Sequence, residues 1–221
     1  MRQISRLCLH RLPRAFAVGH TYQPETLIER LTMKTKVATK APARVNGVDL
    51  ETLNETITAI QNDPGLGQSK FRARNKWMGG NQNRTTVSGF YAAREEIPHK
   101  QAFEMQADEP PILAGDDEAP NPVEHLLNAL ASCVTTSMVA HAAVRDIEID
   151  ELESELEGDI DLNGFLGLNP DTPKGYTDIR VNFKVKTDPE NLEKLRSLAE
   201  FSPVYNTLLH SPNVTIDVEM K

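Results

Sequence analysis

The sequence predicts one α+β domain. Predicted elements follow one another as a helix, three strands, a long helix, two strands, a helix and a last strand, and strands and helices in that order favour helices packed against an antiparallel or mixed sheet. The chain has 221 residues and is 39% apolar, which is enough for a core of its own. No apolar run approaches the roughly 20 residues of a membrane-spanning helix, so no membrane partner is expected.

The first 48 residues are expected to lie outside this domain, as a disordered N-terminal arm or presequence, with the domain itself spanning 49–221. Residues 1–24 contain no acid and carry several arginines, a pattern that resembles an organelle transit peptide. The alternative is an over-extended translation start, with Met33 as the true beginning. With only two cysteines in the chain, a reducing, cytoplasmic location is the default.

The first half of the domain predicts a helix followed by a small sheet. Asp49 is a plausible N-cap, apolar residues follow at helical spacing, and Asp63-Pro64-Gly65 ends the helix. Strands are predicted over 70–78, 84–92 and 100–107, and the glycines and asparagines of 79–83 make the first two a hairpin. A loop rich in proline and aspartate is expected over 108–121.

Residues 122–145 give the strongest helical pattern in the chain. Pro122 suits the first turn, and Glu124 suits the positive N-terminal end of a helix. One thin face gathers small and apolar residues at i, i+3, i+4 and i+7: Leu126, Ala129, Leu130, Cys133, Ser137 and Ala140. Beyond it, strands are predicted over 152–162, 176–187 and 214–220, with helices over 188–200 and 203–209.

Charge and motif spacing exclude two functions. Residues 101–221 hold 24 acidic against 8 basic residues, so the C-terminal half repels polyanions and no nucleic-acid partner is expected. Residues 159–164 match the start of a calcium-binding EF-hand loop. The twelfth position, which must supply a bidentate glutamate, is Pro170, so no metal site is predicted.

Cys133 is the one candidate nucleophile in the domain. Mid-helix cysteines are commonly buried as small hydrophobes, so a structural role is the simplest interpretation of its position. A reactive thiol needs a cation or a helix N-terminus to lower its pKa, and Cys133 lies about three turns from the helix start. His125 and His141 are each eight residues away, which disfavours a Cys–His hydrolase.

The segment Asn121-Pro-Val-Glu-His-Leu-Leu-Asn-Ala-Leu-Ala-Ser-Cys133 resembles the signature helix of the OsmC/Ohr family, Pro-x-Glu-x-Leu-Leu-x-Ala-Leu-Ala-x-Cys. Three later segments agree in order and spacing: Leu156–Asp159 with Gly164, Gly175–Phe183, and Ser202–Leu208. The resemblance covers about residues 68–221. It implies the OsmC-like fold, with sheets packed on a long central helix in an intertwined homodimer whose active sites lie at the subunit interface.

The resemblance also implies an activity, the thiol-dependent reduction of organic hydroperoxides in the oxidative stress response. In this peroxiredoxin-like chemistry a thiolate attacks the peroxide and becomes a sulfenic acid, and a second cysteine forms a disulfide that a dithiol or lipoyl-type reductant opens. No cofactor or metal is implied. The expected partners are a second copy of the chain, a small organic hydroperoxide and the reductant.

Carried over residue by residue, the resemblance makes Cys133 the peroxide-attacking cysteine and Glu124 the residue that orients an activating arginine. The resolving cysteine falls at Ser202, which places the chain in a single-cysteine branch that needs an external thiol. The hairpin arginine of the family is displaced, and the nearest candidate is Arg84. A surface or cross-strand charge is an equally good interpretation of Arg84, and a helix-end charge is one of Glu124.

Two alternatives stay open at this point. The chain could be a non-enzymatic dimer of the same fold that binds a small apolar molecule or senses redox state through Cys133. Alternatively, Cys8 in the arm could resolve the oxidised Cys133, which would leave a Cys8–Cys133 disulfide after peroxide treatment.

Overall fold

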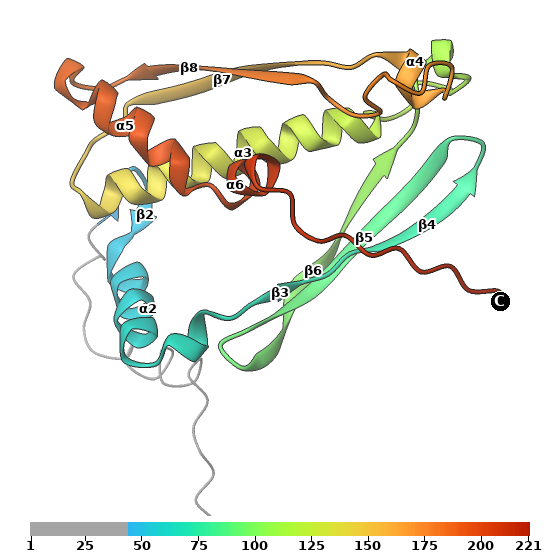
Figure 1. Ribbon diagram of the computed structural model, residues 1–221. Coiled ribbons are helices and arrows are strands. Elements are labelled where there is room, and N and C mark those ends of the chain that lie inside the picture. Colours follow the sequence, from blue (N-terminus) through green and yellow to red (C-terminus); the bar gives the residue numbers. More distant parts are fainter. Residues whose placement is uncertain (1–43) are drawn as a thin grey trace, which may run out of the picture. The chain divides into compact units, whose positions relative to one another are not determined.

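The computed structural model describes residues 44–221, and Figure 1 shows its helices and strands. The strands are β1 (Arg44–Val45), β2 (Val48–Asp49), β3 (Lys70–Phe71), β4 (Arg74–Gly79), β5 (Gln82–Ala92), β6 (Glu95–Ala107), β7 (Glu151–Asp159) and β8 (Asp178–Lys186). The α-helices are α2 (Leu50–Asn62), α3 (Pro122–Val144), α4 (Leu162–Phe165), α5 (Leu192–Leu198) and α6 (Pro203–Leu209). Short 3₁₀ turns are η2 (Pro64–Gly67), η3 (Pro111–Leu113), η4 (Pro189–Asn191) and η5 (Ala199–Phe201).

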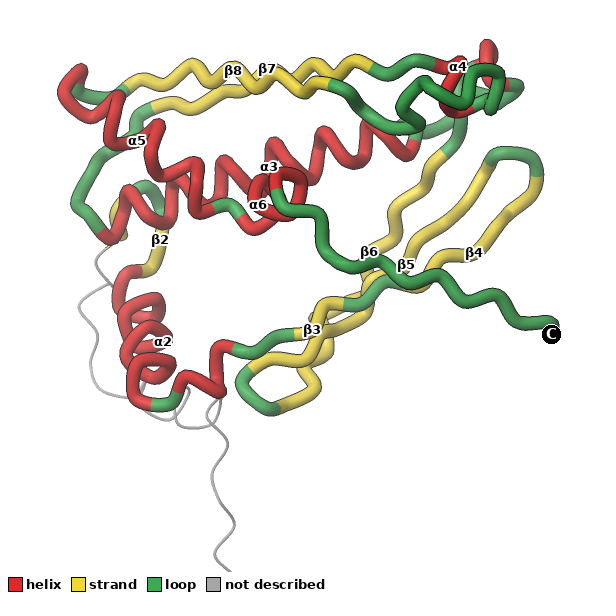
Figure 2. The backbone as a smooth tube through the Cα atoms, in the orientation of Figure 1, coloured by secondary structure: helices red, strands yellow, loops and turns green. Residues whose placement is uncertain are grey.

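The strands form three antiparallel sheets (Figure 2). The first is the β1–β2 hairpin, and the third is the β7–β8 pair. In the second, β5 pairs with β6 on one side and with both β3 and β4 on the other. The predicted α+β class is therefore confirmed, with antiparallel pairing wherever strands pair in residues 44–221.

The described fold begins five residues before the predicted boundary at residue 49. Asn46, at φ 53°, turns the chain between β1 and β2. Its side-chain amide donates to the Ile147 carbonyl and accepts from the Ile149 N–H, both at 2.9 Å. The hairpin is thus fastened to the segment between α3 and β7. The predicted arm, with Cys8 and Met33, lies outside the described residues except for 44–48, which form this hairpin.

Helix α2 and the β3–β6 sheet follow the predicted order with shifted ends, and the single strand predicted over 70–78 is divided into β3 and β4. Asp49 caps α2 by accepting from the Thr52 N–H at 3.1 Å, as predicted. Strand β6 begins at Glu95 rather than near residue 100, because Ala93 (φ 50°) and Arg94 (φ 66°) make a two-residue turn of the kind that joins antiparallel strands tightly. Neither residue is the glycine or asparagine that usually marks such a turn, so the sequence carried little signal for it.

The core lies along one ridge of α3. Leu130, Val134, Met138 and Ala142 follow one another at i+4 spacing and are all buried. They pack with Ile147 and with Leu195 and Leu198 of α5, while side chains of β7, β8 and α6 close the cluster. Of the thin face predicted for this helix, only Leu130 is fully buried, because the ridge that meets the other elements is rotated toward Val134 and Met138.

Helix α3 is also long and apolar enough to cross a bilayer by length and composition alone. Its buried ridge forms the core of this domain, and 28% of its most apolar stretch is buried there.

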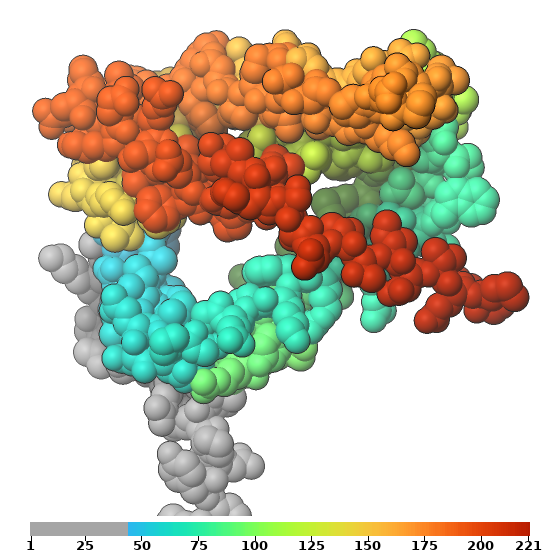
Figure 3. Space-filling model, in the orientation of Figure 1, coloured from blue at the N-terminus to red at the C-terminus, as the bar shows by residue number. Residues whose placement is uncertain are grey.

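Two predicted elements near the C-terminus differ from the structure. The single helix over 188–200 is divided into η4, α5 and η5. The prediction of a strand over 214–220 is wrong, because residues after Leu209 form neither helix nor strand. Their alternation of apolar side chains is real, yet strand hydrogen bonds need a neighbouring strand, and none of the described strands pairs with them. In Figure 3 this segment leaves the rest of the chain as a single extended run.

Truncating Leu195 should destabilise the domain, because its side chain is 2% exposed within the α3 core cluster. We expect Leu195→Ala to lower the free energy of unfolding by about 2–5 kcal/mol, measured by denaturant titration. Leu192→Ala on the same helix is the matched control, since Leu192 is 49% exposed and should lose much less. Equal losses in both variants would contradict this placement of the core.

Candidate functional site

The first turn of α3 is held by a reciprocal capping box. Asn121 Oδ1 accepts from the Glu124 N–H, and Glu124 Oε2 accepts from the Asn121 N–H, each at 2.8 Å. Pro122 occupies the first helical position, where a missing N–H costs nothing. Glu124 is therefore an exposed carboxylate that caps the helix. This agrees with the interpretation of Glu124 as a helix-end charge.

Cys133 lies in the middle of α3 and is half-buried with a free thiol. It directly precedes the buried Val134, and it follows Leu126 and Leu130 by seven and three residues, which places the three on neighbouring positions of one helix face. The side chain thus stands at the margin of the core ridge. A small molecule can reach a thiol at this margin, whereas the side chains of Leu130 and Val134 are fully buried.

Arg84 lies on β5, between Lys76 of β4 and Gln106 of β6. Its Nε is buried and has no hydrogen-bond partner among the described residues. A buried donor without an acceptor costs free energy, so this guanidinium is suited to receive an anionic or polar group. Arg84 lines a small cavity of about 80 Å³ together with Gln106, Asp108 and Glu118.

The three residues predicted to act together are not in contact in this chain. Within residues 44–221, no hydrogen bond or ion pair joins Arg84 to Glu124 or to Cys133. A side-chain-to-backbone hydrogen bond does join their elements, because the His125 ring Nε2 lies 2.8 Å from the Gln106 carbonyl. The carbonyl can only accept, so His125 donates, and the strand neighbour of Arg84 is thereby fixed to the residue after Glu124.

The loop between β6 and α3 fixes the end of β5 that carries Arg84. The buried Asp108 carboxylate accepts from the N–H groups of Glu109, Asp116 and Glu118 at 2.8–3.2 Å. Burial alone would raise the pKa of Asp108, but these backbone donors hold it below its ordinary value. Asn81, in the β4–β5 turn, donates to two carbonyls of the same loop, so the hairpin tip is attached to the segment that enters α3.

An apolar cavity of about 400 Å³ lies beside the first half of α3. Leu126 and Leu130 form its α3 side, and β8 and α6 supply the rest. The other lining residues are mostly apolar, with one carboxylate among them: Tyr176, Thr177, Asp178, Ile179, Val181, Tyr205, Leu208 and Leu209. Because Leu126 and Leu130 share a helix face with Cys133, the cavity borders the thiol-bearing side of the helix.

Tyr176 is a site residue that the sequence analysis did not single out. Its hydroxyl donates to the Val123 carbonyl at 3.1 Å, which ties the start of β8 to the first turn of α3. Burial raises the pKa of Tyr176, and the negative charge of Glu124 raises it further. The residue that points to this packing is Gly158 on β7, because a Cβ atom there would lie only 2.5 Å from the Tyr176 ring.

Ser202 occupies the position predicted for the missing resolving cysteine. It is fully buried and caps α6, its Oγ accepting from the Tyr205 N–H at 3.2 Å. The position therefore has a structural role in this chain. The described residues also contain no cluster of His, Cys, Asp or Glu that could hold a metal ion.

Adding a methyl group at Gly158 should disturb this site, because the new Cβ would overlap the Tyr176 ring. We expect Gly158→Ala to destabilise the protein by about 1–3 kcal/mol in thermal or denaturant unfolding. Gly175→Ala is the control, because no atom lies within 4 Å of a Cβ placed there. A Gly158→Ala protein as stable as the control would contradict the close packing of Tyr176 on β7.

Comparison with known proteins gives one family. Residues 115–217 match the model described as OsmC-like protein, a span that runs from the β6–α3 loop through α3, Cys133 and Ser202 to the segment after α6. No curated protein matches this chain.

Solved structures of OsmC-like proteins share a low sequence identity with this chain. An OsmC-like protein from Mycoplasma pneumoniae is 18% identical over 64% of this chain and 89% of its own, with a TM-score of 0.48. An organic hydroperoxide resistance protein, OsmC, from Legionella pneumophila is 17% identical over 63% and 90%, with a TM-score of 0.43. An OsmC-like protein of unknown function from Vibrio cholerae is 16% identical over 63% and 94%, with a TM-score of 0.46. Residues 115–217, which contain the signature helix with Cys133, are therefore identified as an OsmC-like domain.

Proposed function

We propose that the protein is a thiol-dependent reductase of organic hydroperoxides that uses Cys133 as its only reacting cysteine. The observation that carries this proposal is the half-buried free thiol of Cys133 on the helix face that borders an apolar cavity of about 400 Å³. An apolar cavity takes up the alkyl part of an organic hydroperoxide, and a margin position leaves the sulfur reachable.

The first step oxidises Cys133. Its thiolate sulfur attacks the terminal oxygen of the hydroperoxide, a sulfur–oxygen bond forms and the oxygen–oxygen bond breaks. The departing alkoxide takes up a proton and leaves as an alcohol. Cys133 is left as a sulfenic acid, and the peroxide has been reduced by two electrons.

The second step regenerates the thiol with an external reductant, because Ser202 stands where a resolving cysteine would be. One thiolate of a dithiol, such as a lipoyl group, attacks the Cys133 sulfur and displaces water to form a mixed disulfide. The second thiolate of the same dithiol then attacks that disulfide and releases Cys133. The dithiol leaves as a cyclic disulfide, so one dithiol is consumed for each hydroperoxide.

Arg84 is the cation proposed to lower the pKa of the Cys133 thiol, and Glu124 is proposed as the positioning residue for Arg84. Two observations support Arg84: its Nε lacks a partner among residues 44–221, and its strand neighbour Gln106 is bonded to His125 at the start of α3. In the single chain no hydrogen bond joins Arg84 to Cys133, so the proposal relies on the homodimer that the family resemblance implies to bring them together. We place this dimer in the cytoplasm, with no nucleic-acid or membrane partner.

A second function is favoured by the same separation of Arg84 from Cys133. Without an activating cation, the protein would be a non-enzymatic dimer that binds a small apolar molecule in the α3 cavity or senses redox state through Cys133. The measured pKa of the thiol separates the two functions. A value well below the roughly 8.5 of free cysteine favours the reductase, and a value near or above it favours the binder.

Replacing Cys133 should abolish peroxide reduction if the proposal is right. Purified wild type and Cys133→Ser would be mixed with an organic hydroperoxide and dihydrolipoamide, and peroxide loss followed with time. We expect loss to fall to the uncatalysed rate in the variant, because serine lacks a thiolate at neutral pH. Peroxide consumption at the wild-type rate by Cys133→Ser would refute the proposal.

Glu124 should have separable roles in folding and in catalysis. Glu124→Gln keeps an acceptor for the Asn121 N–H, so we expect wild-type stability, together with slower peroxide loss and a thiol pKa that rises toward about 8.5. Glu124→Ala should lose stability as well, by about 0.5–2 kcal/mol.

Arg84→Met should raise the thiol pKa in the same direction as Glu124→Gln. Lys184→Met is the control, since it removes a cation that pairs with Glu155 on the β7–β8 sheet. If the thiol pKa is unchanged in Arg84→Met and in Glu124→Gln, these two residues do not activate Cys133.

A further inference from the structure

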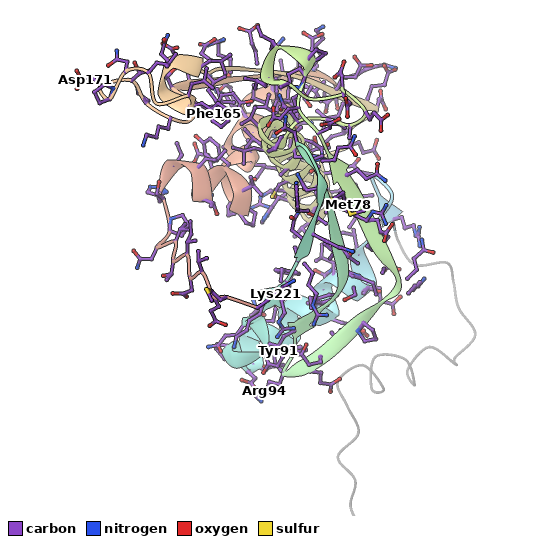
Figure 4. The ribbon with its side chains drawn as sticks, turned by 90° about the vertical axis from the view of Figure 1, so that its right-hand side faces the viewer. Met78, Tyr91, Arg94, Phe165, Asp171 and Lys221 are labelled. Carbon is purple, nitrogen blue, oxygen red and sulfur yellow. The ribbon has the colours of Figure 1, made fainter. Side chains whose placement is uncertain are left out.

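An open cavity of about 320 Å³ lies on the β3–β6 sheet. Its lining comes from β4, β5, β6 and the two residues between β3 and β4, and none of it comes from α3. Tyr91 and Arg94, which are labelled in Figure 4, mark the turn end of the β5–β6 hairpin, and the cavity lies toward this end. Arg84 and Cys133 do not line it, so the cavity is separate from the candidate functional site.

The cavity lies where the pairing of β5 with β6 is interrupted. The register shifts between Val87 and Gly89, which leaves Ser88 without a ladder partner on β6. Bulges of this kind re-aim side chains and are frequent next to active sites. A Cβ atom at Gly89 would lie 2.7 Å from the Ile97 carbonyl oxygen, so glycine permits the close approach of the two strands here. The hollow therefore follows from the course of the backbone.

Two guanidinium groups and one carboxylate line the cavity, those of Arg72, Arg74 and Glu96. Arg72 donates to both Glu96 oxygens, at 2.7 and 2.9 Å, which is the two-bond geometry in which a guanidinium recognises a carboxylate. The ion pairs among residues 44–221 do not include Arg74. The cavity thus holds one carboxylate already and has a second guanidinium without an anion in the described chain.

The charges of these three groups do not cancel. The hydrogen bond from Arg72 holds the pKa of Glu96 below its ordinary value, so Glu96 is ionised at neutral pH. Two guanidinium charges and one carboxylate charge leave a single positive charge in excess. A monoanion neutralises this charge, whereas a dianion would leave a negative charge close to Glu96.

Apolar surface and a hydroxyl group complete the lining that a ligand would meet. Phe90, Ile97 and Pro98 supply apolar surface from β5 and β6. Thr86 pairs with Arg74 in the β4–β5 register, so its hydroxyl lies beside the Arg74 side chain. A ligand that fits this lining has a negative group at Arg74 and an apolar body on the β6 side.

We propose that the cavity binds a small organic acid that carries one carboxylate and an aromatic or branched body. The carboxylate accepts from the Arg74 guanidinium and the Thr86 hydroxyl, and the body packs on Ile97 and Pro98. The cavity volume is at the lower end of the roughly 300–1,000 Å³ of small-molecule sites, so the ligand is small. The proposal is independent of the Cys133 chemistry, because this cavity and the one beside α3 share no lining residue.

Calorimetric titration of the full chain with benzoate tests the ligand class. Acetate keeps the carboxylate without the aromatic body, and benzamide keeps the body without the charge. We expect benzoate to bind at least about tenfold more tightly than either compound. Inorganic phosphate is the fourth probe, and tighter binding of phosphate than of benzoate would overturn the preference for a monoanion. Lack of saturable benzoate binding at millimolar concentration would overturn the site itself.

Two substitutions locate the site. Arg74→Met removes the cation, and we expect it to weaken benzoate binding at least about tenfold. Lys184→Met is the control, because it removes an exposed cation of the β7–β8 sheet and should leave the affinity unchanged. Wild-type affinity in Arg74→Met would refute the site, as would equal losses in both variants.

Glu96→Gln tests the charge balance. The substitution removes the negative charge that competes with the ligand, so benzoate should bind at least about threefold more tightly. A gain of affinity cannot result from misfolding, so this variant separates binding from stability. Unchanged or weaker benzoate binding in Glu96→Gln would contradict the proposal. Because every readout is an affinity, a failed peroxidase assay would leave these results unaffected.

Discussion

The first turn of α3 is the point on which the described structure depends. Four hydrogen bonds are made there. Two form the Asn121–Glu124 capping box, one joins the Tyr176 hydroxyl to the Val123 carbonyl, and one joins the His125 ring to the Gln106 carbonyl. The β3–β6 sheet and the β7–β8 sheet share no strand in the described chain, so their common anchor is this turn. Helix α3 has 23 residues including this turn, and the core ridge begins about two turns from the helix start, at Leu130.

The same anchor decides what the candidate site can do. Cys133 takes its position from α3, the cavity beside Leu126 and Leu130 is closed by β8 and α6, and Arg84 belongs to the sheet that meets α3 through His125. The half-buried thiol and its apolar neighbours therefore belong to one compact part of the chain. The cation belongs to another part, which the His125 ring joins to the first through the Gln106 carbonyl. The proposed activity therefore requires a second copy to bring the thiol and the cation together.

Local chemistry explains which elements could be predicted from the sequence. The α2 cap at Asp49 and the start of α3 at Asn121-Pro122 were predictable because side chain and backbone satisfy each other within four residues. The Ala93-Arg94 turn was missed because its residues lack turn propensity and are held in place by the long β5–β6 pairing. Residues 214–220 show the reverse case. Their alternation of apolar and polar side chains is typical of a strand, but a strand forms only when its backbone pairs with a second strand. For the site, the family resemblance supplied Cys133, Glu124 and Arg84, whereas Tyr176 became visible only through Gly158 on another strand.

The structural role of Ser202 opposes its replacement by a resolving cysteine. The Oγ atom of this buried serine ends α6 by binding the Tyr205 N–H, and a sulfur atom in its place is larger and a weaker acceptor. A second thiol at this position would therefore come with a poorer start to α6, a helix whose Tyr205 and Leu208 side chains wall the cavity beside α3. Under the proposed activity, a chain with serine here would keep a well-formed cavity and would need thiols from outside the protein. Its capacity against peroxide would then follow the supply of reduced dithiol in the compartment more than the amount of the protein.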